Sequence, residues 1–167
     1  MREAGDHSLS RAPLEPGAYR ALVGRELGVS GWQRIDQSAI DTFADLTDDH
    51  QFIHVDPLRA RATAFGGTVA HGFLTLSLLS HFAREVVPPL AGAVMSVNYG
   101  IEKLRFPAPV PAGANLRGRF LLKDLRQRRL HQWLLVLDVR VEIEGSEKPA
   151  VSAEWLRLIV LTPSSPR

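Results

Sequence analysis

The stretch that decides the fold reads GFLTLSLLSHFAREVV and runs from Gly72 to Val87. It is mostly apolar, it opens at a glycine, and the pair Pro88-Pro89 ends any helix that forms there. Polar and charged residues interrupt it, and it is shorter than the ~20 apolar residues that a membrane-spanning helix requires. We therefore expect a buried helix in a soluble protein.

The sequence after this helix changes its periodicity. Within residues 130–143, apolar residues alternate with polar or charged ones, which is typical of a strand with one buried face and one wet face. Further strands are expected at 32–35, 94–101, 114–122 and 151–161. Helices followed by a run of antiparallel strands favour an α+β domain, and an apolar helix with few charges suits the centre of a curved sheet.

Length and composition predict one domain, which we place at residues 17–163, after a flexible polar tail at residues 1–16. The chain has 167 residues, of which 45% are hydrophobic, and typical domains run to ~100–200 residues. The polar start lacks the apolar core of a signal peptide, and the chain has no cysteine; both features fit a cytoplasmic protein. The net charge of +2 is too small to indicate nucleic-acid binding.

Two shorter helices are expected ahead of the apolar one. Asp36 or Ser38 can cap a helix that ends near Asp48. Asp56, which is followed by a proline, can cap a second helix that runs through Ala62.

Titratable side chains crowd the segment from Asp48 to Asp56, where three aspartates and two histidines fall within nine positions. Hydration of a double bond needs a carboxylate and an imidazole in this kind of arrangement. One group takes a proton from water, while the other holds the water or supplies a proton to carbon. Asp49 and His54 can converge in this way only if the chain between them turns back. Taken on local chemistry alone, the segment could equally consist of helix caps and surface acids.

A glycine-rich segment leads from Ala64 into the apolar helix at Gly72. Free N–H groups at a helix N-terminus suit an oxyanion, such as the oxygen of a thioester whose α-carbon gains or loses a proton. We expect the backbone N–H of Gly72 to be the donor, with that of Phe73 as a possible second one. Gly72 could instead serve tight packing. We interpret His71 as a structural histidine, because no proton that it could move is apparent.

These motifs resemble those of the MaoC-like, (R)-specific enoyl-CoA hydratases, and most closely the mycobacterial members of the nodulation-protein-N-like branch. The first motif extends from Phe43 to Asp56 and the second from Phe65 to Leu74. Residues 105–113 resemble a further family signature, and the resemblance covers residues 30–160. It implies a hot-dog fold, in which a curved antiparallel sheet wraps a long central helix, and a homodimer.

The resemblance also implies roles for individual residues. Asp49 and His54 would hold one water for syn addition to a trans-2-enoyl thioester, giving the (R)-3-hydroxyacyl product, with dehydration as the reverse reaction. The N–H of Gly72 would bind the thioester oxygen. Ser80 would assist near Asp49, and Gln51, where the family commonly has asparagine, would shape the loop. No cofactor and no metal is implied, and the substrate would be an acyl-CoA or an acyl-carrier thioester.

The sequence departs from the family at two positions, where Asp48 replaces a common glycine and Phe52 a common proline. Three alternatives stay open. A hot-dog thioesterase would send water to the carbonyl carbon, although the spaced acid–imidazole pair favours hydration. A catalytically silent acyl-binding module would keep the fold without the reaction. A metal site made by His50, His54 and Asp56 is disfavoured. The two histidines are four residues apart in an expected loop and so do not share one face of a helix.

Basic residues follow one another in the second half of the chain between Arg117 and Arg129. No aromatic residues for base stacking are interleaved with them, so a solvated hairpin is expected rather than a nucleic-acid site. In a second interpretation, some of these arginines, or Lys103 and Arg105, contact the phosphates of coenzyme A or of a phosphopantetheine carrier.

Overall fold

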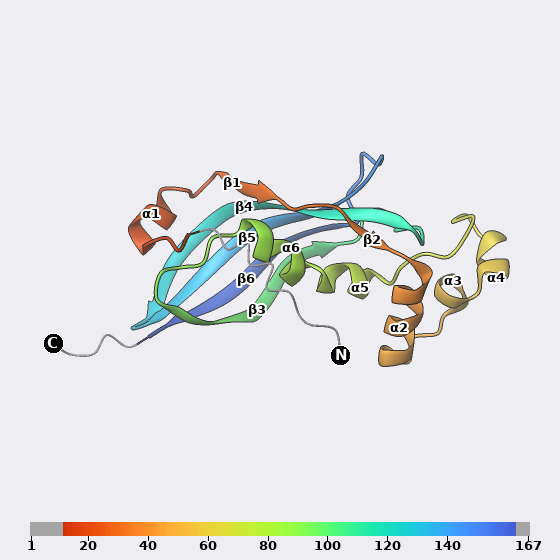
Figure 1. Ribbon diagram of the computed structural model, residues 1–167, viewed down its shortest axis with the longest axis horizontal. Helices are drawn as coiled ribbons and strands as arrows, with labels where there is room; N and C mark the ends of the chain where they lie inside the picture. The colour runs from red at the N-terminus through yellow and green to blue at the C-terminus, as the bar shows by residue number, and fades with distance from the viewer. Residues whose placement is uncertain (1–11, 163–167) are drawn as a thin grey trace.

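A curved antiparallel sheet wraps two consecutive helices in the computed structural model, which describes residues 12–162 (Figure 1). The strands are β1 (Glu26–Val29), β2 (Gln33–Ile35), β3 (Ala93–Arg105), β4 (Ala114–Arg129), β5 (Gln132–Ile143) and β6 (Val151–Leu161). The helices are α1 (Pro16–Arg20), α2 (Gln37–Thr47), α3 (Phe52–Val55), α4 (Pro57–Arg61), α5 (Gly72–Ser77) and α6 (Leu79–Val86).

The sheet has the strand order β1-β4-β5-β6-β3, and β2 pairs with another part of β4. All pairings are antiparallel. The β4–β5 hairpin pairs from Leu116 opposite Ile143 to Arg129 opposite Gln132, and its register shifts between Leu122 and Asp124 and again between Gln127 and Arg129. The order leaves one edge of β3 unpaired among the described residues. The prediction of an α+β domain with a helix at the centre of a curved sheet is confirmed.

The core lies between the concave face of the sheet and helices α5 and α6. The alternation predicted for β5 appears from Leu137 to Ile143, where every second side chain is buried. Earlier in the strand both faces are covered, because Leu134 and Val136 pack with Leu156 in a second, small cluster of buried residues. The alternation therefore breaks where the other face of the sheet is covered as well.

Helix α6 packs closely against the sheet at Gly118 of β4. A Cβ atom at this position would lie 2.6 Å from Cβ of Phe82 and 2.7 Å from Cε2 of Phe120. Phe82 and Phe120 are fully buried there, and each contributes roughly 1.5–3 kcal/mol by leaving water. Ser30 holds the backbone on the other side: its N–H donates to the oxygen of Gly118, and its Oγ accepts from the N–H of Gly118, both at 2.9 Å.

The predicted long helix is divided at Leu78, where α5 ends and α6 begins. At the break the N–H of Leu78 donates to the oxygen of Thr75, three residues back, at 3.3 Å. Two hydroxyl groups compete for carbonyls in this turn: Oγ1 of Thr75 donates to the oxygen of His71, and Oγ of Ser77 to that of Leu74. The helix therefore makes one tighter turn, with a hydrogen bond between residues three apart instead of four, where α5 meets α6.

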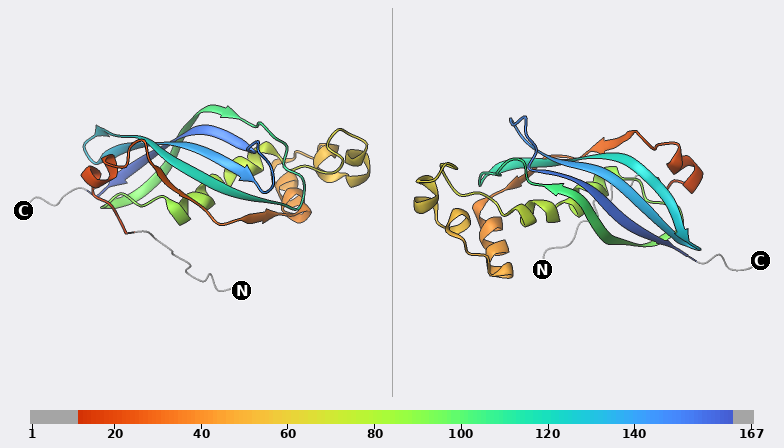
Figure 2. Two further views of the ribbon diagram at one scale, coloured as in Figure 1. Left: turned by 90° about the horizontal axis from the view of Figure 1, so that it is seen from above. Right: turned by 180° about the vertical axis from the view of Figure 1, so that it is seen from behind.

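Helices α2, α3 and α4 lie together at one end of the molecule, beyond the sheet (Figures 1 and 2). Asp36 caps α2 by accepting from the N–H of Ala39 at 3.0 Å, and α2 ends at Asp48, as predicted. Asp56 caps α4 through its Oδ1, also as predicted. The segment expected as a loop between them instead contains the short helix α3, which turns the chain back toward α2.

The first described residues are fixed to the loop that follows α6. The N–H of Leu14 donates to the oxygen of Pro89 at 3.0 Å, and the N–H of Ala91 donates to the oxygen of Leu14 at 2.9 Å. Of the predicted tail at 1–16, residues 1–11 lie outside the described residues. Within 12–162, no helix combines the length and the apolar character needed to cross a membrane.

The predicted basic segment, residues 117–129, lies on β4, and some of its cations pair with carboxylates on neighbouring strands. Arg117 and Arg119 both contact Glu142, at 2.7 and 2.6 Å. Lys123 and Lys103 both contact Glu154, and these two hydrogen bonds lower the pKa of the Glu154 carboxyl group. These four cations are already paired within the chain.

Replacing Gly118 with alanine is expected to lower the free energy of unfolding by about 1–3 kcal/mol, because Phe82 and Phe120 must move to admit the new Cβ. Urea unfolding followed by circular dichroism measures the change. Gly67→Ala is the matched control, since a Cβ at Gly67 meets nothing within 4 Å. Equal stability of the two variants would contradict the close contact of α6 with β4.

Candidate active site

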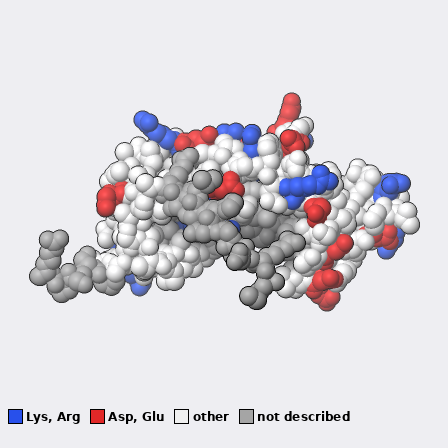
Figure 3. Space-filling model, in the orientation of Figure 1, with Lys and Arg blue, Asp and Glu red and all other residues white. Residues whose placement is uncertain are grey.

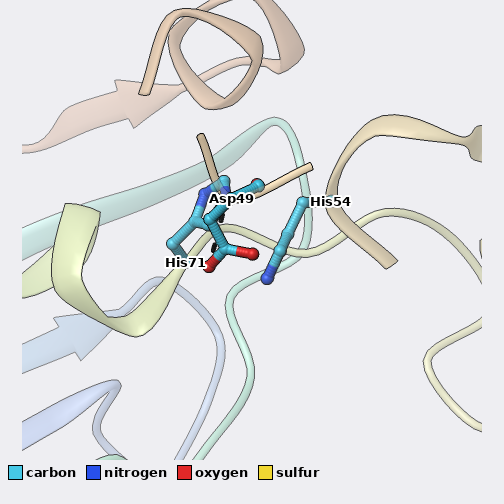
Figure 4. A group of neighbouring side chains, drawn as sticks. All are labelled: Asp49, His54 and His71. Carbon is cyan, nitrogen blue, oxygen red and sulfur yellow. Dashed lines mark hydrogen bonds and ion pairs between the residues drawn. The ribbon is translucent and has the colours of Figure 1, made fainter. Parts of the chain in front are cut away.

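Three titratable side chains converge at the end of the molecule where α2, α3 and α5 meet (Figure 4). Asp49 follows α2, His54 lies on α3, and His71 immediately precedes α5. One nitrogen or oxygen atom of each lies within 4.8 Å of those of the other two. The structure thus brings the two side chains predicted as a catalytic pair close together, and it adds His71 to them.

His54 is 7% exposed and is held by its Nδ1 atom, which lies 2.6 Å from the oxygen of Val69. A carbonyl oxygen can only accept a hydrogen bond, so this contact assigns the proton of the neutral ring to Nδ1. The other nitrogen, Nε2, then carries the lone pair. A base with a fixed ring and an available lone pair is what abstraction of a proton from water requires.

The side chain of Asp49 is 56% exposed, and one of its oxygens, Oδ2, lies 4.0 Å from Nε2 of His71. Its main chain is fixed from two sides. The N–H of Asp49 donates to the oxygen of Ala44 at 3.2 Å, and its carbonyl oxygen lies 2.9 Å from Nε2 of His71. The carboxylate can therefore reach solvent or substrate while its backbone stays in place.

His71, interpreted from the sequence as a structural residue, is 3% exposed and stacks on the catalytic candidate His54. Their ring centroids are 3.7 Å apart with an interplanar angle of 26°. Phe43 lies against His71 at 5.1 Å between centroids. The position of His71 directly before Gly72 places it next to the predicted oxyanion donor in the sequence. Nothing in the sequence indicates that its ring stacks on that of His54.

Gln37 ties the segments of the site together and was missed by sequence reasoning. Its Nε2 donates to the carbonyl oxygen of His54 at 2.7 Å, and its Oε1 accepts from Oγ1 of Thr68. These partners are 17 and 31 residues away in the chain, so no local pattern could reveal them.

Gly72 begins α5, and the ring of Phe106 covers it. A Cβ at Gly72 would lie 3.0 Å from two ring carbons of Phe106. Tight packing and a role for the Gly72 N–H as donor are compatible, because the ring occupies the Cβ direction and not the N–H direction. Phe106 belongs to the segment 105–113 that resembled a family signature, and it also contacts the ring of Phe73 at 6.0 Å.

A pocket of about 390 Å³ begins next to Gly72, at Phe73, and continues between the central helices and the edge of the sheet. Its walls come from α5, α6, β3 and β6: Phe73, Leu76, Ser77, Leu79, Ser80, Asn98, Tyr99, Gly100, Ile101 and Trp155. Ser80, predicted to assist near Asp49, thus faces this pocket, whereas Asp49 is not among the lining residues.

Gln51 directly precedes α3, and its carbonyl oxygen accepts from the N–H of His54 at 2.9 Å. Its side chain forms no capping hydrogen bond with the helix. The main chain of Gln51 therefore shapes the turn between Asp49 and His54, whereas the amide group has no such part in it.

The three residues weighed as a metal site, His50, His54 and Asp56, do not converge. Nε2 of His50 lies 2.9 Å from Asp45, and this hydrogen bond raises the pKa of His50. His50 thus pairs with the exposed carboxylates of Asp45 and Asp48. Figure 3 shows acidic side chains gathered over α2. The carboxylate of Asp56 is occupied in capping α4.

The cluster that could hold a metal is instead Asp49, His54 and His71. Because Nε2 of His71 faces the carbonyl oxygen of Asp49, it carries a proton and has no lone pair for a cation. A metal ion at this nitrogen would have to break the hydrogen bond and exchange the tautomer of His71, so only Nδ1 of this ring offers a lone pair.

Comparison with known proteins gives a consistent family. The profile of the MaoC like domain matches residues 19–142. Nodulation protein N of Rhizobium meliloti (strain 1021) is 49% identical over 144 residues, or 86% of this chain and 89% of that protein. The 3-hydroxyacyl-thioester dehydratase Z of Mycobacterium tuberculosis (strain ATCC 25618 / H37Rv) is 43% identical over 134 residues, or 80% of this chain and 88% of that protein.

Among solved structures, the (R)-hydratase from A. caviae involved in PHA biosynthesis has a TM-score of 0.67 at 27% identity. The alignment covers 81% of this chain and 94% of that one. The hot-dog fold and the family expected from the sequence are confirmed.

Replacing Gln37 with alanine is expected to lower the free energy of unfolding by about 1–2 kcal/mol, because the oxygen of His54 and the hydroxyl of Thr68 both lose a hydrogen bond. Urea unfolding measures this loss. Gln33→Ala is the control, since the amide of Gln33 is exposed and donates only to the neighbouring residue Arg34. A variant of Gln37 as stable as that of Gln33 would show that Gln37 does not tie the segments of the site together.

Proposed function

The chain belongs to the MaoC-like hydratase and dehydratase family, and on this premise we propose that it adds water reversibly to a trans-2-enoyl thioester. The product is the (R)-3-hydroxyacyl thioester. The proposal rests on the short distance between the side chains of Asp49 and His54, which have polar atoms within 4.8 Å of one another, and on the free lone pair at Nε2 of His54. The pair lies at the end of the molecule where α5 begins, and the pocket starts one residue beyond Gly72.

In the proposed reaction one water molecule is held between Asp49 and His54. Nε2 of His54 takes a proton from this water while its oxygen bonds to the β-carbon of the substrate. Asp49 accepts the second hydrogen of the water and so orients it. The electron pair of the double bond moves toward the thioester carbonyl, and the proton on His54 then passes to the α-carbon on the same face. Hydrogen and hydroxyl both come from one water, which gives syn addition.

The developing negative charge on the thioester oxygen is stabilised by the backbone N–H of Gly72. This donor suits the role because the first N–H groups of a helix have no acceptor within the helix. Glycine has no side chain of its own beside this N–H, and the ring of Phe106 takes up the space where a Cβ would lie. The N–H of Phe73 is the second candidate donor.

The pocket that starts at Phe73 is the proposed acyl site. Apolar side chains from α5, α6 and β3 line most of it, as an acyl chain requires, and Ser80 and Asn98 add polar groups. Whether the thioester carrier is coenzyme A or a carrier protein, its phosphates would have to find cations other than Arg117, Arg119, Lys103 and Lys123, which are paired within the chain.

We further propose a homodimer joined along β3. This strand is at the edge of the sheet, and an unpaired edge is a template for another strand. Its large apolar side chains are unusually accessible. They are Val94 at 64%, Met95 at 52%, Val97 at 40%, Tyr99 at 50% and Ile101 at 39% exposure. A second copy of the chain would cover them and would also close one side of the acyl pocket, to which Tyr99 and Ile101 contribute.

Asp49→Asn and His54→Ala are each expected to lose more than about 99% of the rate of enoyl-CoA hydration, since general acid–base groups contribute ~10²–10⁴-fold. Loss of the conjugated-enoyl absorbance measures the rate over a panel of acyl chain lengths. Asp48→Asn is the matched control, because Asp48 is fully exposed next to the site and should retain activity.

The same assay, combined with a measurement of free thiol, distinguishes hydration from thioester hydrolysis. Release of free thiol with the enoyl absorbance unchanged would identify a thioesterase. Full hydration activity in both Asp49→Asn and His54→Ala would rule out the proposed pair.

The wild-type protein is expected to elute as a dimer, and Val97→Lys to shift it toward monomer, because a lysine at the centre of β3 would be buried against its copy. Size-exclusion chromatography with light scattering gives both masses. Val23→Lys is the control, since Val23 is similarly exposed, at 44%, but lies outside β3. A dimer that survives the change at Val97 would contradict the β3 interface.

A further inference from the structure

His71 touches three parts of the proposed reaction centre at once. Its Nε2 lies 2.9 Å from the carbonyl oxygen of Asp49, its ring stacks on that of His54, and its own peptide group contains the N–H of Gly72. No other described residue contacts the first two and adjoins the third. The reaction scheme above gives His71 no proton to transfer, so its role has to follow from these contacts.

The contact with Asp49 fixes the tautomer of His71. Since a carbonyl oxygen only accepts, Nε2 carries the proton, and Nδ1 is left with a lone pair. Nδ1 is buried and has no hydrogen-bond partner among residues 12–162. A second proton at Nδ1 would be a buried donor without an acceptor among these residues.

The stack with His54 combines two opposite tautomers. His54 carries its proton on Nδ1, which faces Val69, whereas His71 carries its proton on Nε2, which faces Asp49. Each ring is thus anchored to a backbone carbonyl, and each blocks rotation of the other at 3.7 Å between centroids.

The groups that face His71 from the surrounding segments are few. Asp49 lies on the α2 side, His54 on α3, and the ring of Phe43 on α2. The carboxylate of Asp49, at 4.0 Å, is the only one of the acidic side chains in the described segments that pairs with His71.

The peptide group between His71 and Gly72 is anchored as well. Its carbonyl oxygen accepts from the N–H of Thr75 at 3.2 Å and from Oγ1 of Thr75 at 3.3 Å. In a trans peptide the N–H points away from the C=O, so these bonds also direct the N–H of Gly72. Thr75 thus orients the peptide that carries the proposed oxyanion donor, and the ring of His71, attached to the same peptide, contacts Asp49 and His54.

We propose that His71 is a positioning residue, which sets Asp49, the ring of His54 and the N–H of Gly72 in one geometry. This inference rests on the proposed hydration. It predicts that the rate at saturating substrate depends on His71 although the residue touches no reacting atom. Small displacements of groups that must act together cost large factors in rate, on the order of 10²-fold for ~1 Å.

Two variants of His71 separate its contacts. His71→Gln keeps an N–H donor for the oxygen of Asp49 but lacks the ring, whereas His71→Phe keeps the ring against His54 but lacks the donor. Each is expected to lower kcat by about tenfold to a hundredfold with KM nearly unchanged, and His71→Ala, which lacks both, to fall below either. Partial recovery by Gln and by Phe relative to Ala is the signature of two separate contacts.

His81→Gln is the control, because His81 is a half-exposed histidine on α6 outside the site and should leave kcat unchanged. Thermal unfolding of every variant shows which of them fold. A folded His71 variant with the wild-type kcat, or one that raises KM alone, would overturn the positioning role.

A second measurement does not depend on activity or on the folding of a variant. Side-chain ¹⁵N–¹H spectra of the histidine rings in the wild-type protein should show the proton of His71 on Nε2 and that of His54 on Nδ1. The reverse tautomer in His71 would overturn the inference. If the tautomers are as expected but no enoyl thioester is hydrated, the proposed function fails while the arrangement around His71 stands.

Discussion

The contact between α6 and β4 at Gly118 is the constraint on which the other parts of the molecule depend. Only a residue without a side chain lets the helix come this close, and the rings of Phe82 and Phe120 fill the space on either side. This contact sets how closely α6 packs on the sheet. Helix α5 joins α6 at Leu78, and the site lies where α5 begins, next to Gly72.

The site is assembled around the start of α5 from segments that are distant in the chain. The turn made by α3 brings His54 back toward Asp49, and Gln37 joins the main chain of α3 to the segment that precedes α5. Backbone carbonyls, rather than other side chains, hold both imidazole rings. A site built in this way leaves the carboxylate of Asp49 and Nε2 of His54 available for a water and a substrate.

The sequence predicted much of this, and the physical reasons are visible in particular residues. Period-two alternation on β5, the caps at Asp36 and Asp56, and the glycine at the start of the central helix are local signals, and each predicted element is present. The break at Leu78 depends on which carbonyls the hydroxyls of Thr75 and Ser77 bind, and the stacking of His71 on His54 depends on how segments pack. The hydroxyl bonds are local but not fixed by residue type, and the stack joins residues 17 positions apart, so neither feature leaves a trace in spacing or composition.

The central claim is that Asp49 and His54 direct one water to the β-carbon of an enoyl thioester on a single face. Chiral analysis of the product formed by the wild-type protein from a trans-2-enoyl-CoA in D₂O tests it most directly. The account predicts the (R)-3-hydroxyacyl thioester with one deuterium on the α-carbon, syn to the new hydroxyl group. An (S) product, deuterium on the opposite face, or a free acid with its double bond intact would contradict it.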